Sequence, residues 1–89
     1  MKATKIKMKK GCTYSNSTRE IDSIYLDATN NYWKKEVVHD YLVTHPKSIQ
    51  VNIFPYPFLE PVESKYGEKY VRSAANDSSK DNLLQLPRE

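Results

Sequence analysis

The most regular alternation of apolar and polar residues in this chain runs from Ser48 to Phe54. Residues 49, 51 and 53 are Ile, Val and Ile, and polar residues stand between them. A period of two predicts a β-strand with one apolar face, and we expect that strand over 48–54. Pro55 and Pro57 follow directly. Because proline cannot donate a hydrogen bond to a ladder, they end the strand.

Between residues 34 and 44 the period lengthens to that of a helix. The apolar residues at this spacing are Val37, Val38, Tyr41 and Leu42, with Trp33 one turn earlier. They predict an amphipathic helix that stops before Pro46, because proline restricts the residue preceding it. We expect the apolar side to close against Ile49, Val51 and Ile53 in one dry interior. The residues expected to face water are Lys34, Lys35, Glu36, His39 and Asp40.

Weaker patterns predict the flanking strands. Alternation over 4–9 predicts a first strand, and β-branched and aromatic residues over 20–27 predict a second. The alternation of the second strand is imperfect, which indicates a bulge. Segments 58–64 and 68–73 predict a closing hairpin, in which Gly67 supplies the positive φ of the turn.

The end of the chain is also patterned. Residues 76–81 are polar and predict a turn. Leu83, Leu84 and Leu86 are too apolar for a free tail, so we expect them to pack back onto the domain.

These elements predict one α+β domain that spans residues 1–89. We expect a small antiparallel or mixed sheet of four to five strands in ββαββ order, with one helix packed on one face. No internal repeat, low-complexity tract or linker divides the chain.

The composition narrows the class of protein. Of 89 residues, 38% are hydrophobic and 28% charged, which is typical of a folded domain with a thin core. Cys12 is the sole cysteine and cannot form an internal disulfide, which favours a reducing, cytoplasmic location and a structural thiol. No apolar run has the length of a secretion signal or a membrane span, so no membrane partner is expected.

The positive charge is concentrated at the start of the chain. The net charge is +3, yet beyond residue 12 nine basic residues face eleven acidic ones. If 4–9 is a strand, Lys5, Lys7 and Lys9 share one face, opposite Ile6. Such a stripe is either a solvated edge that prevents sheet aggregation, which we favour, or a nucleic-acid site. Lys5, Lys7 and Lys9 are therefore the candidate nucleic-acid residues.

A second candidate site follows the strand at 48–54. Phe54, Tyr56 and Phe58 alternate with the two prolines. Exposed, these rings would form an aromatic patch that docks a protein partner. A rigid connector whose rings pack on the core is the interpretation that we favour.

No residue pattern points to catalysis, a metal or a cofactor. His39 and His45 are six residues apart and do not stack on one helical face, so we expect both at the surface. With only Gly11 and Gly67 available, a glycine-rich phosphate loop cannot be built. We therefore expect no catalytic residue, no metal and no cofactor, and a protein that is not an enzyme.

The C-terminal third carries two motifs, Gly67-Glu68-Lys69-Tyr70-Val71-Arg72-Ser73 and Ser79-Lys80-Asp81-Asn82-Leu83-Leu84-Gln85-Leu86-Pro87. They resemble the ends of a family of short uncharacterised bacterial and phage-associated proteins, which close with G-x-x-Y-[VL]-R-[ST] and S-x-x-N-L-x-x-L-P. The resemblance implies a cytosolic domain of unknown function and brings no catalytic residue. It also implies that Asp81-Asn82 caps the leucine run.

We therefore predict a non-enzymatic interaction module whose partner is an unidentified protein or a second copy of the chain. Two alternatives stay open. One is weak nucleic-acid binding through the basic first strand, and the other is sequestration of a small ligand, for which the sequence indicates no pocket.

Overall fold

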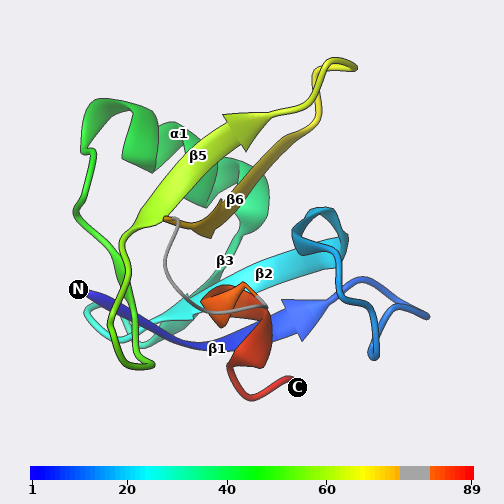
Figure 1. Cartoon of the computed structure of the whole chain (residues 1–89), viewed down its shortest axis with the longest axis horizontal. Coiled ribbons are helices and arrows are strands. Elements are labelled where there is room, and N and C mark those ends of the chain that lie inside the picture. Colours follow the sequence, from blue (N-terminus) through cyan, green and yellow to red (C-terminus); the bar gives the residue numbers. More distant parts are fainter. Residues whose placement is uncertain (75–80) are drawn as a thin grey trace.

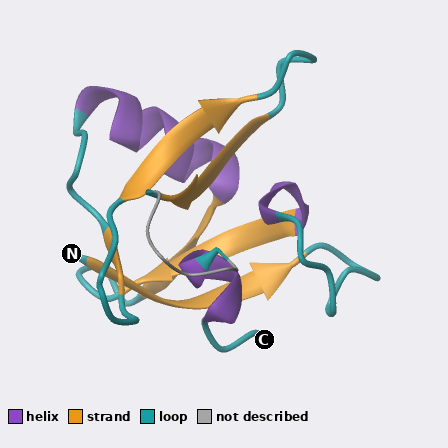
Figure 2. Cartoon of the chain, viewed as in Figure 1, coloured by secondary structure: helices purple, strands orange, loops and turns teal. Residues whose placement is uncertain are grey.

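The computed structural model describes residues 1–74 and 81–89 and has an α+β fold (Figures 1 and 2). The strands are β1 (Lys2–Met8), β2 (Ile21–Leu26), β3 (Asn31–Lys34), β4 (Gln50–Val51), β5 (Leu59–Glu63) and β6 (Lys69–Ser73). The helix is α1 (Lys35–Thr44), and two short 3-10 helices are η1 (Thr18–Glu20) and η2 (Asn82–Gln85).

The strands form two sheets. One is a mixed four-stranded sheet in the order β3-β2-β1-β4, in which only the β1–β4 pairing is parallel. The other is the β5–β6 hairpin, which together with α1 lies above the first sheet in Figure 1. The predicted fold class is confirmed, and so is the closing hairpin, where Gly67 has a φ of 83°. The hairpin does not extend the first sheet, because it packs against the helix instead.

Bulges set the faces of the first two strands. The β1–β2 register shifts between Ala3 and Lys5 and again between Lys7 and Met8. As a result Ala3, Ile6 and Met8 are the buried residues of β1. The bulge predicted in the second strand is present, because the pairing passes over Asp22.

The edge strand β3 was not predicted from the sequence. Trp33 was expected to be the first residue of the helical stripe. Asn31–Lys34 instead pairs with β2, and Trp33 lies opposite Ile24. Because β3 is the outermost strand, the Trp33 ring is only partly covered.

The helix is where predicted, but its buried face is different. Lys35, Val38, His39 and Leu42 are buried. Val37 and Tyr41 are 50% and 37% exposed, so their expected burial was wrong. The cause is tertiary: α1 contacts β5 and β6 as well as β2, and the hairpin covers the side that carries Lys35 and His39.

The strand expected over 48–54 is much shorter. Only Gln50–Val51 pairs with β1, opposite Lys2 and Ala3. Ile49 and Val51 are fully buried and Ile53 is partly buried, so the predicted apolar face is real. The ladder ends early because the chain then bends into the segment with the two prolines.

The core lies between the four-stranded sheet and the layer of α1, β5 and β6. Its buried hydrophobic residues are Ala3, Ile6, Met8, Ile21, Ile24, Leu26, Val38, Leu42, Ile49, Val51, Leu59, Val71, Leu83, Leu84 and Leu86. The three leucines of the C-terminal segment therefore pack back as predicted. Asp81 caps them by accepting hydrogen bonds from the Leu83 amide at 2.9 Å and the Ser73 hydroxyl at 2.6 Å. The turn predicted at 76–81 lies, apart from Asp81, outside the described residues.

Candidate binding surfaces

The segment that links β4 to β5, residues 52–58, forms an exposed aromatic connector. Phe54 is 80% exposed, and Tyr56 and Phe58 are also exposed. The rings of Phe54 and Tyr56 meet edge to face, with centroids 6.1 Å apart, and the Lys2 ammonium lies 5.0 Å from the Tyr56 centroid. The favoured expectation that these rings pack on the core was therefore wrong.

The aromatic connector is held in one shape by hydrogen bonds. The Tyr56 amide donates to the Ile53 carbonyl at 2.7 Å, and the Val51 amide donates to the Pro57 carbonyl at 2.9 Å. The Gln50 side chain donates to the Tyr56 carbonyl at 3.1 Å. Tyr56 itself has a φ of 60°, the left-handed conformation that costs a residue with a Cβ about 1 kcal/mol or more. A fixed loop loses little conformational entropy when it binds a partner.

An apolar pocket of about 240 Å³ lies between α1 and the β2–β3 turn. Its lining residues are Met1, Leu26, Thr29, Trp33, Val37, Val38, Tyr41 and Ile49. It exists because the buried face of α1 is turned toward the hairpin, which leaves Val37 and Tyr41 beside Trp33 without cover. The Trp33 indole donates to the Thr29 hydroxyl at 2.8 Å, so the polar atom of the ring is satisfied.

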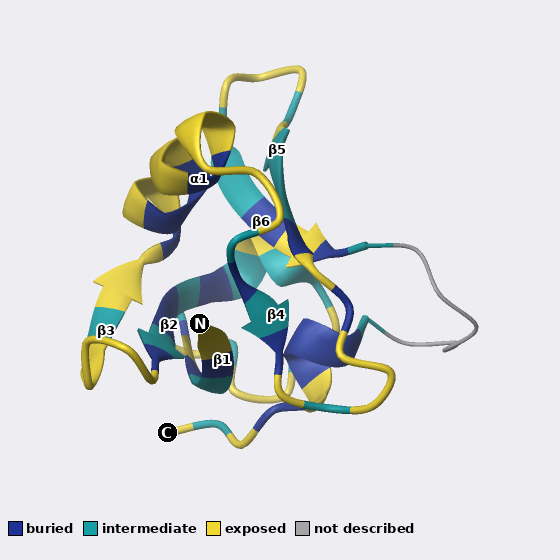
Figure 3. Cartoon of the chain, turned by 90° about the vertical axis from the view of Figure 1, so that its left-hand side faces the viewer, coloured by how far each residue is buried: buried dark blue, intermediate teal, exposed yellow. Residues whose placement is uncertain are grey.

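The start of the chain links the apolar pocket to the aromatic connector, because Met1 lines the pocket and the Lys2 ammonium lies over the Tyr56 ring. Figure 3 shows β3 to the left of the N-terminus, α1 above it and the loop after β4 to its right. Sequence analysis found the connector from its residue types. It missed the pocket, because the pocket depends on which face the helix buries.

The structure separates the three lysines of the basic strand. Lys5 and Lys7 lie on the outer face of the four-stranded sheet, with their ammonium groups 4.5 Å and 4.8 Å from the ring centroids of Tyr25 and Tyr32. Lys9 follows the end of β1 and forms an ion pair of 3.3 Å with Glu68. The three candidate nucleic-acid residues therefore do not form one stripe.

The outer face of this sheet is also partly neutralised. Lys5 forms an ion pair with Glu89 at 3.3 Å. The Tyr32 hydroxyl is buried close to the same carboxylate, and burial together with that negative charge raises the pKa of Tyr32 to about 12. Of the three lysines, only Lys7 has no anionic partner among the described residues.

A buried lysine lies on the other side of the core. Lys35 was expected to face water, yet it is 2% exposed. Its ammonium donates to the Arg19 carbonyl at 2.5 Å and to Glu68 at 3.1 Å. Hydrogen bonds from Lys35 and then Lys9 lower the pKa of Glu68, so this carboxylate stays ionised near neutral pH. The charge of Lys35 is thereby compensated, as a buried charge requires.

The loop before η1 is fixed by a second carboxylate. Glu20 accepts hydrogen bonds from the Ser15 hydroxyl and, at 3.0 Å, from the Cys12 thiol. These bonds lower the pKa of Glu20, and the carboxylate in turn raises the pKa of the Cys12 thiol. A raised thiol pKa is the opposite of what a nucleophilic cysteine needs.

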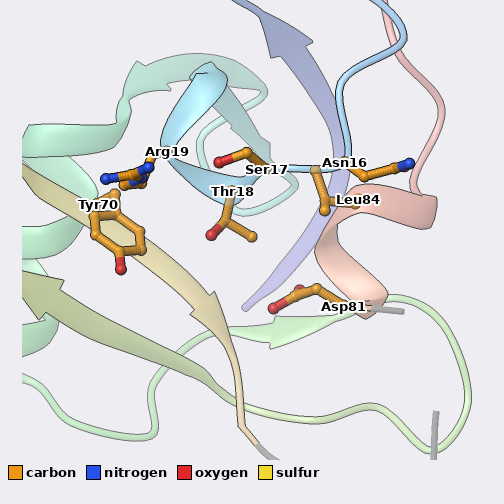
Figure 4. Close-up of a pocket in the computed structure, with 7 residues that line it drawn as sticks. All are labelled: Asn16, Ser17, Thr18, Arg19, Tyr70, Asp81 and Leu84. Atoms are coloured by element: carbon orange, nitrogen blue, oxygen red, sulfur yellow. The ribbon is translucent and has the colours of Figure 1, made fainter. Parts of the chain in front are cut away.

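A polar pocket of about 490 Å³ lies between η1, β6 and η2 (Figure 4). Its lining residues are Asn16, Ser17, Thr18, Arg19, Tyr70, Asp81 and Leu84. Arg19 and Tyr70 stand at one end, the side chains of Ser17 and Thr18 lie in the middle, and Leu84 and Asn16 are at the other end (Figure 4). The sequence does not reveal this pocket, because its residues come from three distant segments and no spacing links them.

The position of His39 also differs from the expectation. It was expected at the surface but is buried, and its Nδ1 lies 3.0 Å from the Asp40 carboxylate, which also pairs with Lys69 at 3.1 Å. His45 is exposed, as expected. Within residues 1–74 and 81–89, no three His, Cys, Asp or Glu side chains gather in the manner of a metal site. Over the same ranges, no helix is long and apolar enough to span a bilayer.

Comparison with known proteins identifies a family without a known activity. No curated protein and no solved structure matches the chain. The family model described as "Protein of unknown function (DUF3892)" matches residues 2–87, which is nearly the whole chain. The protein therefore belongs to the DUF3892 family of proteins of unknown function.

Proposed function

We propose that this protein is a non-enzymatic interaction module that binds a second copy of itself, with Phe54 of each copy seated in the apolar pocket of the other. The observation that carries the proposal is the exposure of the aromatic connector close to an unfilled apolar pocket, the two being linked by Met1 and Lys2. Contiguous exposed apolar surface of this kind is rare on small monomers and marks interaction sites.

The two surfaces match in size and chemistry. A dry apolar cavity of about 150 Å³ accepts a benzene ring. The apolar pocket is larger, at about 240 Å³, and is lined almost entirely by apolar side chains. Phe54 is the most exposed aromatic residue of the connector, so its ring is available for insertion. Burial of an aromatic anchor in a fitted pocket is the usual form of a binding hot spot.

Symmetry supports a closed dimer. In a two-fold dimer, a residue that contacts a site on the partner is matched by the reciprocal contact. Met1 lines the pocket and Lys2 lies over Tyr56 of the connector, so a two-fold axis near the start of β1 can form both contacts together. The two insertions then reinforce each other, and the assembly does not grow into a filament.

The experiment is sedimentation velocity over a wide range of protein concentration. We expect a concentration-dependent dimer in the native chain and a monomer in both Phe54→Ser and Val37→Lys, because each variant removes one half of the contact. Both side chains are exposed, so both variants fold. Tyr66→Ser is the control, since Tyr66 is an equally exposed aromatic on the hairpin turn.

Mixing the two variants gives the sharper result. Phe54→Ser keeps its pocket and Val37→Lys keeps its phenylalanine, so a mixture restores one of the two contacts and yields a heterodimer weaker than the native dimer. A native chain that is monomeric at every concentration contradicts the proposal. So does a dimer that neither variant disturbs.

Nucleic-acid binding is the second candidate and is less well supported. The outer sheet face does combine Lys5 and Lys7 with two tyrosine rings, which is the composition of a base-stacking platform. However, Lys5 and Lys9 already pair with carboxylates. Adding a single-stranded oligonucleotide to the same sedimentation cell tests it, because binding through this face must weaken with salt and with Lys7→Gln.

A further inference from the structure

We propose that the polar pocket beside η1 binds a small molecule through a phosphate or carboxylate group held by Arg19. The inference is independent of the dimer, because the polar pocket shares no lining residue with the apolar pocket. It rests on the unpaired guanidinium of Arg19, on the hydrogen bonds that fix the backbone around Arg19, and on the hydroxyls that line the same pocket.

Arg19 is the cation available for binding. Across the described residues, its guanidinium forms no ion pair and no hydrogen bond, whereas Lys9 and Lys35 are both engaged by Glu68. A guanidinium presents a planar fork of donors that matches two oxygens of a carboxylate or a phosphate. The volume of about 490 Å³ is in the range of small-molecule sites.

The backbone around Arg19 is preorganised. The buried Lys35 ammonium donates to the Arg19 carbonyl at 2.5 Å, and Glu20, the next residue, is held by Ser15 and Cys12. A buried lysine is costly unless its charge is paired and its donors are hydrogen-bonded, as they are for Lys35. Here it anchors the short η1 helix, and with it the residue that reaches into the pocket.

The rest of the lining has hydrogen-bonding groups for the same ligand. Ser17 and Thr18 carry hydroxyls in the middle of the pocket, and Tyr70 stands next to Arg19 (Figure 4). Asp81, the one carboxylate among the described lining residues, is committed to Ser73 and to the Leu83 amide and so does not compete for Arg19. An anionic group beside Arg19 with polar atoms toward Ser17 and Thr18 satisfies all of these donors.

An adjoining pocket sets the direction of the ligand. It shares Ser17 and Arg19 with the polar pocket and is otherwise lined by Lys9, Glu20 and Glu68. Glu68 already pairs with Lys9 and Lys35, so the described residues on that side offer an anion no free cation apart from Arg19 itself. The anionic group is therefore placed on the Tyr70 side of Arg19, and the uncharged part extends toward Leu84.

The test is an NMR titration of the amide signals with inorganic phosphate and, separately, with acetate, using sodium chloride at matched ionic strength as the reference. We expect saturable shifts at residues 16–19 and at Tyr70 with at least one of the two anions. The anion that binds with the higher affinity identifies the group that the pocket prefers. Arg19→Gln should weaken this binding at least tenfold, and Arg19→Lys should weaken it less.

Lys65→Gln is the matched control, because it removes one exposed cation from the hairpin turn, far from the pocket, and should leave the titration unchanged. Thr18→Val keeps the shape of the lining and should weaken binding severalfold. Shifts no larger than those with chloride overturn the proposal, as do shifts that persist in Arg19→Gln or that spread over all surface lysines.

Discussion

At the scale of single residues, the clearest feature is the difference between Lys34 and Lys35. They are neighbours in sequence, yet the Lys34 side chain is 64% exposed and that of Lys35 is 3% exposed. Lys34 pairs with Asp22 at the surface, whereas Lys35 joins α1 to η1 and to Glu68, the residue before β6. The two side chains are chemically identical, and their burial differs only because different segments pack around them.

Replacement of these two lysines by methionine should therefore give different results. Lys35→Met leaves the Arg19 carbonyl without its donor and removes one partner of Glu68, so we expect a loss of about 1–3 kcal/mol in the free energy of unfolding. Lys34→Met removes only a surface ion pair, and we expect a loss of about 1 kcal/mol or less. Urea denaturation of the two variants measures both. Equal losses would show that Lys35 is not buried as described.

At the scale of elements, α1 shows how a correct helix acquires an unexpected buried face. Apolar residues 37, 38, 41 and 42 lie on a wide stripe, and only half of it, Val38 and Leu42, is buried. Lys35 and His39 form the other half of the buried face. The aliphatic stem of Lys35 and the imidazole ring of His39 cover hydrophobic surface. Their nitrogen atoms contact the carboxylates of Glu68 and Asp40. The remaining apolar half forms the wall of the apolar pocket.

Two adjacent residues at the end of α1 test this orientation. Leu42 is buried and Val43 is 60% exposed. We expect Leu42→Ala to lower the free energy of unfolding by about 2–5 kcal/mol, because it leaves a cavity in the core. Val43→Ala should change it by about 0.5 kcal/mol or less. Chemical denaturation of both variants is the measurement, and a large loss for Val43→Ala would mean that α1 is rotated about its axis.

At the scale of the whole molecule, contacts between distant segments hold the layers together. The C-terminal residues run beside β1: the Ile6 amide donates to the Pro87 carbonyl at 2.9 Å, and the Glu89 amide donates to the Ile6 carbonyl at 3.0 Å. The Arg88 guanidinium donates to the carbonyls of Thr13 and Leu84, at 2.6 Å and 2.9 Å. Ion pairs such as that of Lys35 with Glu68 hold α1 to the hairpin.

These ion pairs predict how stability depends on pH. The pKa of Glu68 is lowered from its ordinary value of 4.5, chiefly by Lys35, and the pKa of Asp40 is lowered from 3.8, chiefly by His39. A carboxyl with a lowered pKa stabilises the fold above its unfolded-state value and loses that contribution as the pH falls through the folded-state value. We therefore expect the urea midpoint to fall between about pH 5 and about pH 3.

Glu68→Gln should make this acid-induced decrease shallower, because the glutamine does not titrate. The control is Glu63→Gln, since Glu63 forms no ion pair among the described residues and its removal should leave the slope unchanged. A slope that is the same in all three proteins would contradict the assigned role of Glu68.

The sequence predicted the local structure better than the sites. The positive φ of Gly67, the bulge that passes over Asp22 and the packing of Leu83 were all correct, because residue types within a short stretch of the chain indicate each of them. The sequence did not predict strand β3, and it did not predict that the hairpin is separate from the first sheet. A hairpin pairs its own strands whichever surface it packs against, so its residues do not reveal the layer that it joins.

What the sequence alone determined is the order of the helix and of the strands other than β3, the aromatic connector and the absence of a recognisable catalytic motif. Only the tertiary structure decided that the rings of the connector face solvent, that α1 buries Lys35 and leaves Val37 open, and that Arg19 stands in a pocket with Tyr70. The physical reason is the same in each case. Periodicity specifies which face of a helix or strand is apolar, whereas burial depends on which distant segment covers that face.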